Sequence, residues 1–205
     1  MNTKFNLILL AAGESKRMGY PKALLEFDNT HNFLEQILSE YLKHKQLNNI
    51  ILVLNTELLE ISKQQNIKLQ KKIKITFNKN LEKDRFFSIF LAAKKMHIPY
   101  PSFIQNIDNP FIKLEDIDTM IQNLNEKEIL IPKINTENVH PILVNSIIIN
   151  QIKNSPNFEG NLRTFLLHHK KQYIDLQNEM LLLNINTPEN YETIFRQKPK
   201  IKQTN

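Results

Sequence analysis

The sequence predicts an α/β fold, in which a mostly parallel sheet carries helices on both faces. Short apolar segments alternate with segments of helical spacing over the first ~130 residues, which is the order of strands joined by crossover helices. The apolar segments are continuous, as expected for strands that are covered on both faces. The length of 205 residues fits one domain, because single α/β domains often reach about 200 to 250 residues.

The elements follow in chain order from this pattern. The first strand is Phe5 to Leu10, and a polar loop continues from it to Lys22. Further strands are expected at residues 50–54, 73–77, 102–107, 128–131, 141–145, 173–176 and 180–185. Helices are expected at residues 32–44, 56–65, 81–96, 114–124, 147–153 and 161–169, and a closing helix starts at 187. The domain therefore covers residues 1–196, and the basic tail 197–205 is expected to be disordered.

Composition narrows the classes of function. The chain has no cysteine, so it forms no disulfide and no thiolate metal site. The apolar run at residues 7–12 is too short for a signal sequence or a membrane span, so we expect a cytoplasmic protein with no membrane partner. The net charge of +6 attracts polyanions, but no basic stripe interleaved with aromatic residues is present, and nucleic acid is not the expected partner.

Glycine is rare in this chain and clustered in one loop. The chain has 3 glycines, whereas about 14 are usual at this length. Gly13 and Gly19 both lie in the polar loop after the first strand. Because glycine is needed chiefly where φ is positive or where a ligand touches the backbone, this clustering indicates a ligand-binding loop.

The residue types in this loop fit a phosphate ligand. Ligands of open α/β sheets bind beyond the carboxyl ends of the strands, where this loop begins. The small residues Ala11, Ala12 and Gly13 allow a ligand to approach the backbone, and successive N–H groups can surround phosphate oxygens. Arg17 offers a planar fork and Lys22 a point charge to phosphate. The glycine spacing matches neither the P-loop nor the dinucleotide-binding pattern.

The loop also resembles a family signature. Residues 10–22 read L-A-A-G-E-S-K-R-M-G-Y-P-K, which matches every fixed position of L-A-A-G-x-S-x-R-M-G-x-P-K in the molybdenum cofactor cytidylyltransferase-like branch of the nucleotidyltransferases. Related guanylyltransferases usually carry Gly-Gly at 11–12, and methylerythritol cytidylyltransferases place Pro-Lys farther from Arg-Met. The resemblance implies that a nucleoside triphosphate binds at Leu10, Ala11, Ala12, Gly13, Glu14, Ser15, Arg17 and Lys22.

Further segments extend the resemblance over residues 5–195. Asp108-Asn109-Pro110 looks like the D-x-P metal-binding turn of the family, and Asn186-Thr187-Pro188 looks like its D-T-P segment. Asn78 and Ser88 match a segment that contacts the base. Val139-His140-Pro141 looks like G-H-P, and Gly160 resembles a glycine that precedes a helix.

The resemblance implies a Rossmann-like nucleotidyltransferase domain, a Mg²⁺-dependent reaction and the release of pyrophosphate. Asp108 and Asn186 would hold Mg²⁺, Lys22 would stabilise the α-phosphate, and Arg17 would stabilise the leaving pyrophosphate. The chain departs from the family at Asn186, where an aspartate is usual, and at Asp84 and Val139, where glycines are usual. Asn186 can coordinate Mg²⁺ through its carbonyl, but it brings no negative charge to an ion that prefers one or two carboxylates plus substrate phosphates.

The expected function is transfer of a nucleotidyl group, CMP from CTP, to a small phosphorylated acceptor such as molybdopterin. Two alternatives stay open at this point. One is a nucleotide-binding module without turnover, and the other is a sister-branch enzyme that acts on a sugar phosphate or alcohol phosphate. If the Asp84 carboxylate lies beside the base, it would favour a base with an amino group, as in a purine. The sequence indicates neither the acceptor nor the oligomeric state.

Overall fold

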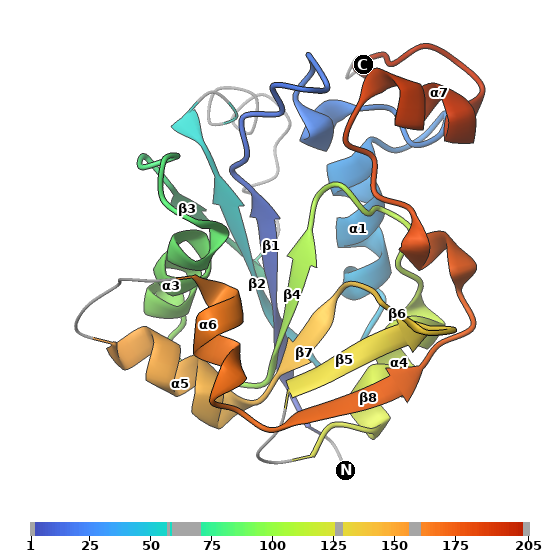
Figure 1. Ribbon diagram of the computed structural model, residues 1–205. Helices are drawn as coiled ribbons and strands as arrows, with labels where there is room; N and C mark the ends of the chain where they lie inside the picture. Colours follow the sequence, from blue (N-terminus) through green and yellow to red (C-terminus); the bar gives the residue numbers. More distant parts are fainter. Residues whose placement is uncertain (1–2, 57, 59–70, 126–128, 156–160, 203–205) are drawn as a thin grey trace.

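The computed structural model describes residues 3–56, 58, 71–125, 129–155 and 161–202. In this part of the chain one eight-stranded sheet forms the centre (Figure 1). Its strands are β1 (Phe5–Ala11), β2 (Leu47–Leu54), β3 (Ile73–Phe77), β4 (Ser102–Asn106), β5 (Ile129–Ile134), β6 (Glu137–Asn138), β7 (Ile142–Val144) and β8 (Lys171–Asp175). The helices are α1 (Phe33–Leu42), α3 (Arg85–Lys95), α4 (Leu114–Gln122), α5 (Ser146–Asn154), α6 (Leu162–Leu167) and α7 (Pro188–Phe195), with short 3-10 helices η1 (Lys22–Leu24) and η3 (Glu179–Leu182).

The sheet confirms the predicted fold class. The strand order is β3-β2-β1-β4-β7-β5-β6, and β8 pairs with β5. β1 is parallel to β2 and to β4, and β2 is parallel to β3. β7 is antiparallel to both β4 and β5, whereas β8 is parallel to β5. The sheet is therefore mixed but mostly parallel, and the strands of the first half follow the predicted βα order.

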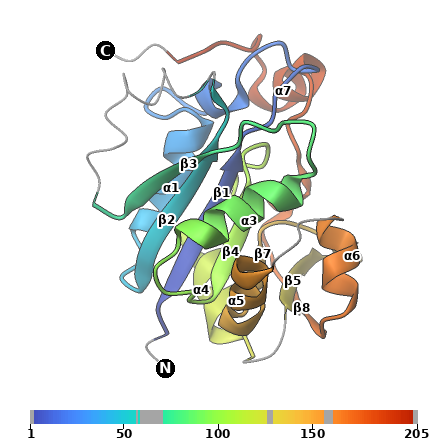
Figure 2. The ribbon, with the colours of Figure 1, turned by 90° about the vertical axis from the view of Figure 1, so that its left-hand side faces the viewer.

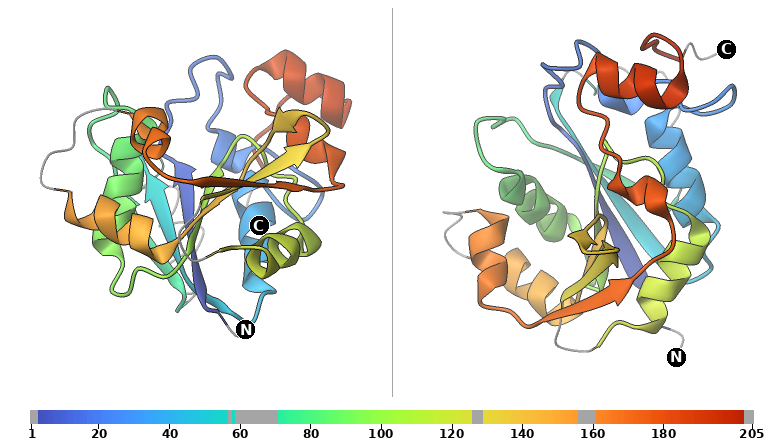
Figure 3. Two further views of the ribbon diagram at one scale, coloured as in Figure 1. Left: turned by 60° about the horizontal axis from the view of Figure 1, so that its bottom comes forward. Right: turned by 45° about the vertical axis from the view of Figure 1, so that its right-hand side comes forward.

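Alternate residues of β1 divide the core into two layers. Leu7 and Leu9 pack with α1, α4 and α7 on one face of the sheet. Ile8 and Leu10 pack with α3, α5 and α6 on the opposite face. Figures 2 and 3 show the two helical layers on either side of the sheet. Because successive strand residues point to opposite faces, one apolar strand supports both layers, as the continuous apolar runs predicted.

Helix starts are set by side-chain caps. Asn32 caps α1 through a capping box, in which its Oδ1 accepts from Glu35 N at 2.9 Å and Glu35 accepts from Asn32 N at 2.8 Å. The helix predicted from residue 81 starts only at Arg85, because the Asp84 carboxylate accepts from Phe86 N at 2.9 Å. Such caps satisfy N–H groups that have no partner within the helix.

Four further expectations differ from the structure or lie outside the described residues. The segment 180–185 is not a strand, since its first part is η3 and its apolar side chains Leu181 and Ile185 pack into the core. The tail is paired through residue 202, where Lys202 N donates to Leu24 O at 3.0 Å and Lys200 Nζ lies 2.9 Å from a Glu26 carboxylate oxygen. Most of the helix predicted at 56–65, and also Gly160, lie outside the described residues.

The topology brings two loops together at one edge of the sheet. β1 and β4 are parallel neighbours, so the loop after Ala11 and the turn after Asn106 emerge side by side. Ile107 N donates to Leu10 O at 3.2 Å and fixes this arrangement.

None of the helices in the described ranges is long and apolar enough to cross a membrane.

Candidate active site

The loop after β1 is held in a defined shape by backbone hydrogen bonds. Ser15 and Gly19 have positive φ values of 53° and 74°. The Ser15 carbonyl accepts from Met18 N at 2.9 Å and from Gly19 N at 3.1 Å, and Ser15 Oγ accepts from Lys22 N at 3.3 Å. Met18, which is only 1% exposed, anchors the loop in the core.

The open part of this loop presents free backbone donors. Within the described part of the chain, the N–H groups of residues 13–17 donate no hydrogen bond. A Cβ added to Gly13 would have no heavy atom within 4 Å, so space remains in front of this backbone. Consecutive unpaired N–H groups beside open space have the geometry of an anion-binding nest.

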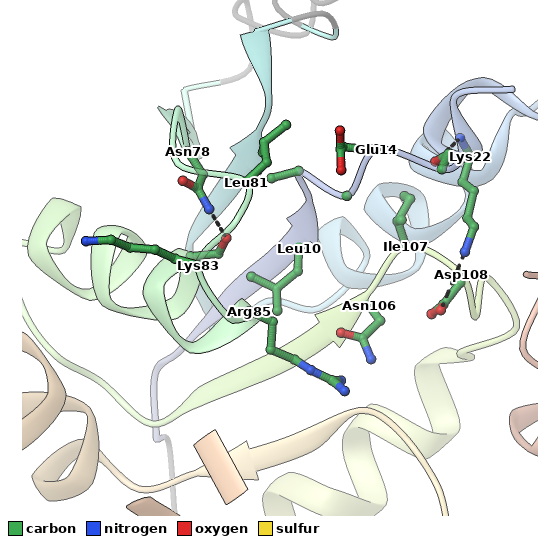
Figure 4. A pocket seen from close by; sticks show the side chains of 14 residues that line it. Leu10, Glu14, Lys22, Asn78, Leu81, Lys83, Arg85, Asn106, Ile107 and Asp108 are labelled. Carbon is green, nitrogen blue, oxygen red and sulfur yellow. Dashed lines mark hydrogen bonds and ion pairs between the residues drawn. The ribbon is translucent and has the colours of Figure 1, made fainter. Parts of the chain in front are cut away.

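A cavity of about 340 Å³ lies in front of the loop (Figure 4). Most of the residues predicted for the site line it: Leu10, Ala12, Gly13, Glu14, Ser15, Lys22, Asn78, Ser88 and Asp108. Ala11 is instead buried in the core, on the other face of the sheet from Leu10. Arg17 and Asn186 line an adjoining hollow of about 230 Å³ that shares Glu14, Ser15 and Lys22 with the cavity.

Lys22 lies between the two residues predicted as metal ligands. Its Nζ donates to Asn186 Oδ1 at 2.7 Å and is 3.8 Å from Asp108 Oδ2. Ile185 N donates to Asp108 O at 2.8 Å, and this bond brings Asn186 to the end of β4. Burial lowers the pKa of Lys22 from its usual range, Asp108 raises it, and Arg17 lowers it.

The donor atoms suit a divalent cation that is shared with a ligand. Asp108 Oδ1 is buried and has no hydrogen-bond partner among the residues that the structure describes, so one carboxylate oxygen remains uncommitted there. In the described residues no group of three or more His, Asp or Glu side chains could enclose a metal ion. Mg²⁺ is commonly held by one or two carboxylates together with substrate phosphates, and Asp108 fits this kind of site.

Asn78 and Ser88 form a buried brace in the cavity wall. Asn78 Nδ2 donates to Ser88 Oγ at 3.0 Å, and Asn78 Oδ1 accepts from Asn80 N at 2.8 Å. The two side chains therefore hold the segment after β3 against α3, as Figure 4 shows. This bracing positions the wall of the cavity where the sequence predicted contact with a base.

Five lining residues were not predicted from the sequence. They are Leu81, Lys83, Arg85, Asn106 and Ile107. Asn106 and Ile107 could have been inferred from their position just before Asp108 at the end of β4. The other three lie between β3 and the first turn of α3, and their approach to β1 depends on how α3 packs on the sheet.

Asp84 does not line this cavity. Its carboxylate caps α3, and the residue instead lines a second cavity, together with His140. Burial lowers the pKa of His140 from its usual range, Arg85 lowers it further, and Asp108 raises it. The sequence-based expectation that Asp84 would select a base therefore has no support from its position.

Comparisons with known proteins bear on the family and the fold of the chain. Residues 7–173 match the family model described as the MobA-like NTP transferase domain. Among curated proteins, 2-C-methyl-D-erythritol 4-phosphate cytidylyltransferase of Fusobacterium nucleatum subsp. nucleatum is 32% identical over 127 residues. That match covers 60% of this chain and 54% of the relative, so the chain matches about half the length of this protein.

Solved structures share the fold over nearly the whole chain. Rv0371c from Mycobacterium tuberculosis has a TM-score of 0.74 at 17% identity, covering 96% of this chain and 100% of its own. A nucleotidyl transferase from Methanothermobacter has a TM-score of 0.75 at 14% identity, covering 93% of this chain and 95% of its own. The 4-diphosphocytidyl-2C-methyl-D-erythritol synthase of Anaerococcus prevotii has a TM-score of 0.72 at 16% identity, covering 96% and 97%. At these identities the likeness concerns the fold.

Proposed function

This chain belongs to the MobA-like NTP transferase family, and on that premise we propose that it transfers CMP from CTP to a small phosphorylated acceptor. The observation that carries the proposal is the cavity in which a loop of unpaired N–H groups faces Lys22 and Asp108. The predicted loop signature and the cytidylyltransferase relative support cytidine as the base.

The donor would lie with its base in the larger cavity and its phosphates along the loop. Residues 13–17 would bind phosphate oxygens through their N–H groups. Lys22, partly buried beside Asp108, would stabilise charge on the α-phosphate. Arg17 lines the adjoining hollow with Lys22, where it would receive the leaving pyrophosphate.

We further propose Mg²⁺ as the cofactor, held by Asp108 and Asn186 together with the phosphates of the donor. The uncommitted Asp108 Oδ1 supports this assignment. When bound, the ion would neutralise phosphate charge. Lys22 Nζ donates a hydrogen bond to Asn186 Oδ1. If Asn186 Oδ1 coordinated Mg²⁺ instead, this hydrogen bond would be lost, and Lys22 would be free to turn toward the α-phosphate.

The reaction requires alignment rather than a covalent nucleophile. An anionic oxygen of the acceptor phosphate attacks the α-phosphorus of CTP. The new P–O bond forms as the bond from the α-phosphorus to the bridging oxygen breaks, and pyrophosphate leaves with the electron pair. The dianionic acceptor has no proton to lose, so the chain need supply only positioning and positive charge.

Two acceptor classes have specific support. The loop signature resembles the molybdenum cofactor branch, which favours molybdopterin. The curated relative is a cytidylyltransferase for 2-C-methyl-D-erythritol 4-phosphate, which favours a phosphorylated alcohol. Both acceptors present a phosphate oxygen as the nucleophile, so the donor chemistry above applies equally to each.

Titration calorimetry with Mg²⁺ and each of the four NTPs tests the donor site. We expect CTP to bind most tightly and Lys22→Ala to weaken it more than about tenfold, since a lost charge-assisted hydrogen bond costs about 1.5 to 3 kcal/mol. Lys95→Ala is the matched control, because Lys95 is an exposed lysine at the end of α3. A preference for GTP would contradict the base assignment, and equal CTP affinity in Lys22→Ala would contradict the site.

A further inference from the structure

The C-terminal tail, residues 197–202, pairs with the segment that follows η1. Ile201 forms an antiparallel bridge with Leu25, and Lys202 N donates to Leu24 O at 3.0 Å. Both leucines are buried in the core. The polar and basic tail therefore lies along a buried segment as a short added strand.

Glu26 holds the tail by two contacts. Its N–H donates to Lys200 O at 3.0 Å, and one of its carboxylate oxygens lies 2.9 Å from Lys200 Nζ. The Glu26 side chain is 14% exposed, and the Lys200 side chain is 52% exposed. Salt screens such a partly buried pair less than a fully exposed one, so this ion pair helps to hold the tail in place.

The turn to which the tail is bound also carries Lys22. η1 begins at Lys22, and Leu25 N donates to Lys22 O at 3.1 Å. Leu25 is thus the residue that closes the turn on Lys22 and also the residue that pairs with Ile201 in the tail. A displacement of residues 24–26 would therefore move the backbone from which the Lys22 side chain extends.

The C-terminal segment also contacts the amine of Lys22. Asn186 Oδ1 accepts from Lys22 Nζ at 2.7 Å, and α7 lies between Asn186 and the tail in the chain. Within α7, Tyr191 OH donates to Glu26 O at 2.7 Å, and α7 lies beside the blue segment that follows β1 at the top of Figure 1. Residues 186–202 thus hold Lys22 by its amine at one end and by its backbone at the other.

Resting on the proposed cytidylyl transfer, we propose that the tail is a positioning element for Lys22 and holds its amine where the donor phosphates bind. Lysine has a flexible four-carbon stem, so the place of its amine depends on the place of its backbone. A displacement of about 1 Å at a reacting centre can cost about a hundredfold in rate. Neither Lys200 nor Lys202 is among the described residues that line the donor cavity in front of the loop or its adjoining hollow. Their effect on the donor must therefore pass through Lys22.

A matched pair of double variants separates release of the tail from a change of charge. The released variant, Lys200→Glu with Lys202→Pro, turns the ion pair into a like-charge pair and removes the N–H that donates to Leu24 O. The control variant is Lys198→Glu with Lys202→Ala. It makes the same change in net charge, since Lys198 is an exposed lysine of the same tail, but it keeps the ion pair with Glu26 and the backbone N–H of residue 202.

The amine of Lys22 can be followed directly by ¹H–¹⁵N NMR of the lysine side chains, with its signal assigned through Lys22→Arg. Because this amine is partly buried and donates to Asn186, we expect its signal to differ from those of exposed lysines. In the released variant alone, the signal should move toward theirs. No nucleotide is needed for this measurement. An unchanged Lys22 signal in the released variant, or the same change in the control variant, would overturn the positioning role.

Titration calorimetry with CTP and Mg²⁺ shows whether the tail acts through Lys22. We expect the released variant to bind CTP at least about threefold more weakly than the control variant. In a Lys22→Ala background the same comparison should give a difference below about 1.5-fold, because the group that the tail positions is gone. A tail that only stabilises the fold would have the same effect on CTP affinity in both backgrounds, and that result would overturn the proposal.

The outcomes distinguish this proposal from the proposed function. If CTP does not bind the unmodified protein but the Lys22 signal changes in the released variant alone, the donor function is wrong and the positioning of Lys22 by the tail stands. If CTP binding depends on Lys22 but the signal is unchanged, the donor site stands and the positioning role is wrong. If the released variant does not fold, Lys202→Pro is compared with Lys202→Ala by the same two measurements and the same criteria.

Discussion

At the scale of single residues, the two glycines of the loop have different physical roles. Gly19 has φ 74°, a conformation that L side chains rarely adopt, whereas Gly13 has ordinary φ and open space where its Cβ would be. The clustering of two glycines in a glycine-poor chain predicted a ligand-binding loop. Glycine is required where φ is positive, as at Gly19, or where a ligand touches the backbone, for which Gly13 leaves space.

The pair gives a matched prediction. Gly19→Ala should destabilise the protein by about 1 to 2 kcal/mol, which lowers Tm by about 2 to 8 °C in a domain of this size. Gly13→Ala should leave Tm unchanged but weaken CTP binding, because its methyl group enters the space in front of the unpaired N–H groups. Differential scanning and titration calorimetry measure both effects. A Gly13→Ala protein with full CTP affinity would contradict the nest.

Asn186 gives a second prediction at this scale. Its Oδ1 accepts from Lys22 Nζ at 2.7 Å, close to Asp108. Asn186→Asp adds a negative charge there, so the Mg²⁺ concentration for half-maximal pyrophosphate release should fall. Asn150→Asp, an exposed change on α5, is the control. An unchanged Mg²⁺ requirement in Asn186→Asp would remove this residue from the proposed metal site.

At the scale of elements, the turn that leads into α1 depends on one carboxylate. Asp28 Oδ1 accepts from Thr30 N at 2.6 Å, Thr30 Oγ1 at 2.7 Å and His31 N at 2.6 Å. Although burial acts in the opposite direction, these hydrogen bonds lower the pKa of Asp28 to about 2 from an ordinary 3.8. The charged carboxylate therefore stabilises the turn above pH 3.8, and that stabilisation is lost as the pH falls toward 2.

Asp28→Ala tests this turn. At pH 7 we expect a loss of about 1 kcal/mol, or about 2 to 4 °C in Tm, since the site is partly exposed. The difference from the unmodified protein should shrink as the pH falls from about 4 to about 2. Chemical unfolding at several pH values measures it. A difference that is constant between pH 7 and pH 2.5 would contradict the role of the charged carboxylate.

Most elements could be predicted because their signal is local. Continuous apolar runs predicted the parallel strands, and helical spacing predicted α1, α4 and α5. The conformation of the segment 180–185 could not be predicted, because a residue far away in the sequence holds its backbone. Asn109 Nδ2 donates a hydrogen bond to Leu181 O at 2.7 Å. The pairing of Ile201 with Leu25 likewise depends on residues far away in the sequence.

The donor cavity was predictable to a greater extent than the second one. Its loop is a contiguous motif, and Asp108 follows a predicted parallel strand, so sheet topology alone brings them together. The second cavity is assembled from α3, β5, β7 and α6. No short motif marks its lining, and Arg85 has the sequence pattern of an ordinary first-turn residue of a helix.

At the scale of the whole molecule, nucleotide binding should stabilise the fold. A ligand at 100 times its Kd adds about 2.7 kcal/mol to the free energy of unfolding, which corresponds to about 5 to 11 °C in Tm. We expect CTP with Mg²⁺ to raise Tm in this range, and Lys22→Ala to reduce the shift at the same CTP concentration. Thermal scans with and without CTP measure this Tm shift. A Tm shift of equal size in Lys22→Ala would contradict CTP binding at the loop that follows β1.

We expect nucleotidyl transfer to take place at the sheet edge formed by β1 and β4. Its most direct test is the rate of Mg²⁺-dependent pyrophosphate release from CTP with phosphorylated acceptors, including 2-C-methyl-D-erythritol 4-phosphate, in the unmodified protein and in Asp108→Asn. We predict release that requires both CTP and acceptor, and a fall of about 10² to 10³ in Asp108→Asn, with Tm retained. Asp175→Asn, an exposed change on β8, should keep full activity. Full activity in Asp108→Asn, or no release with any acceptor at saturating CTP and Mg²⁺, would contradict transfer at this edge of the sheet.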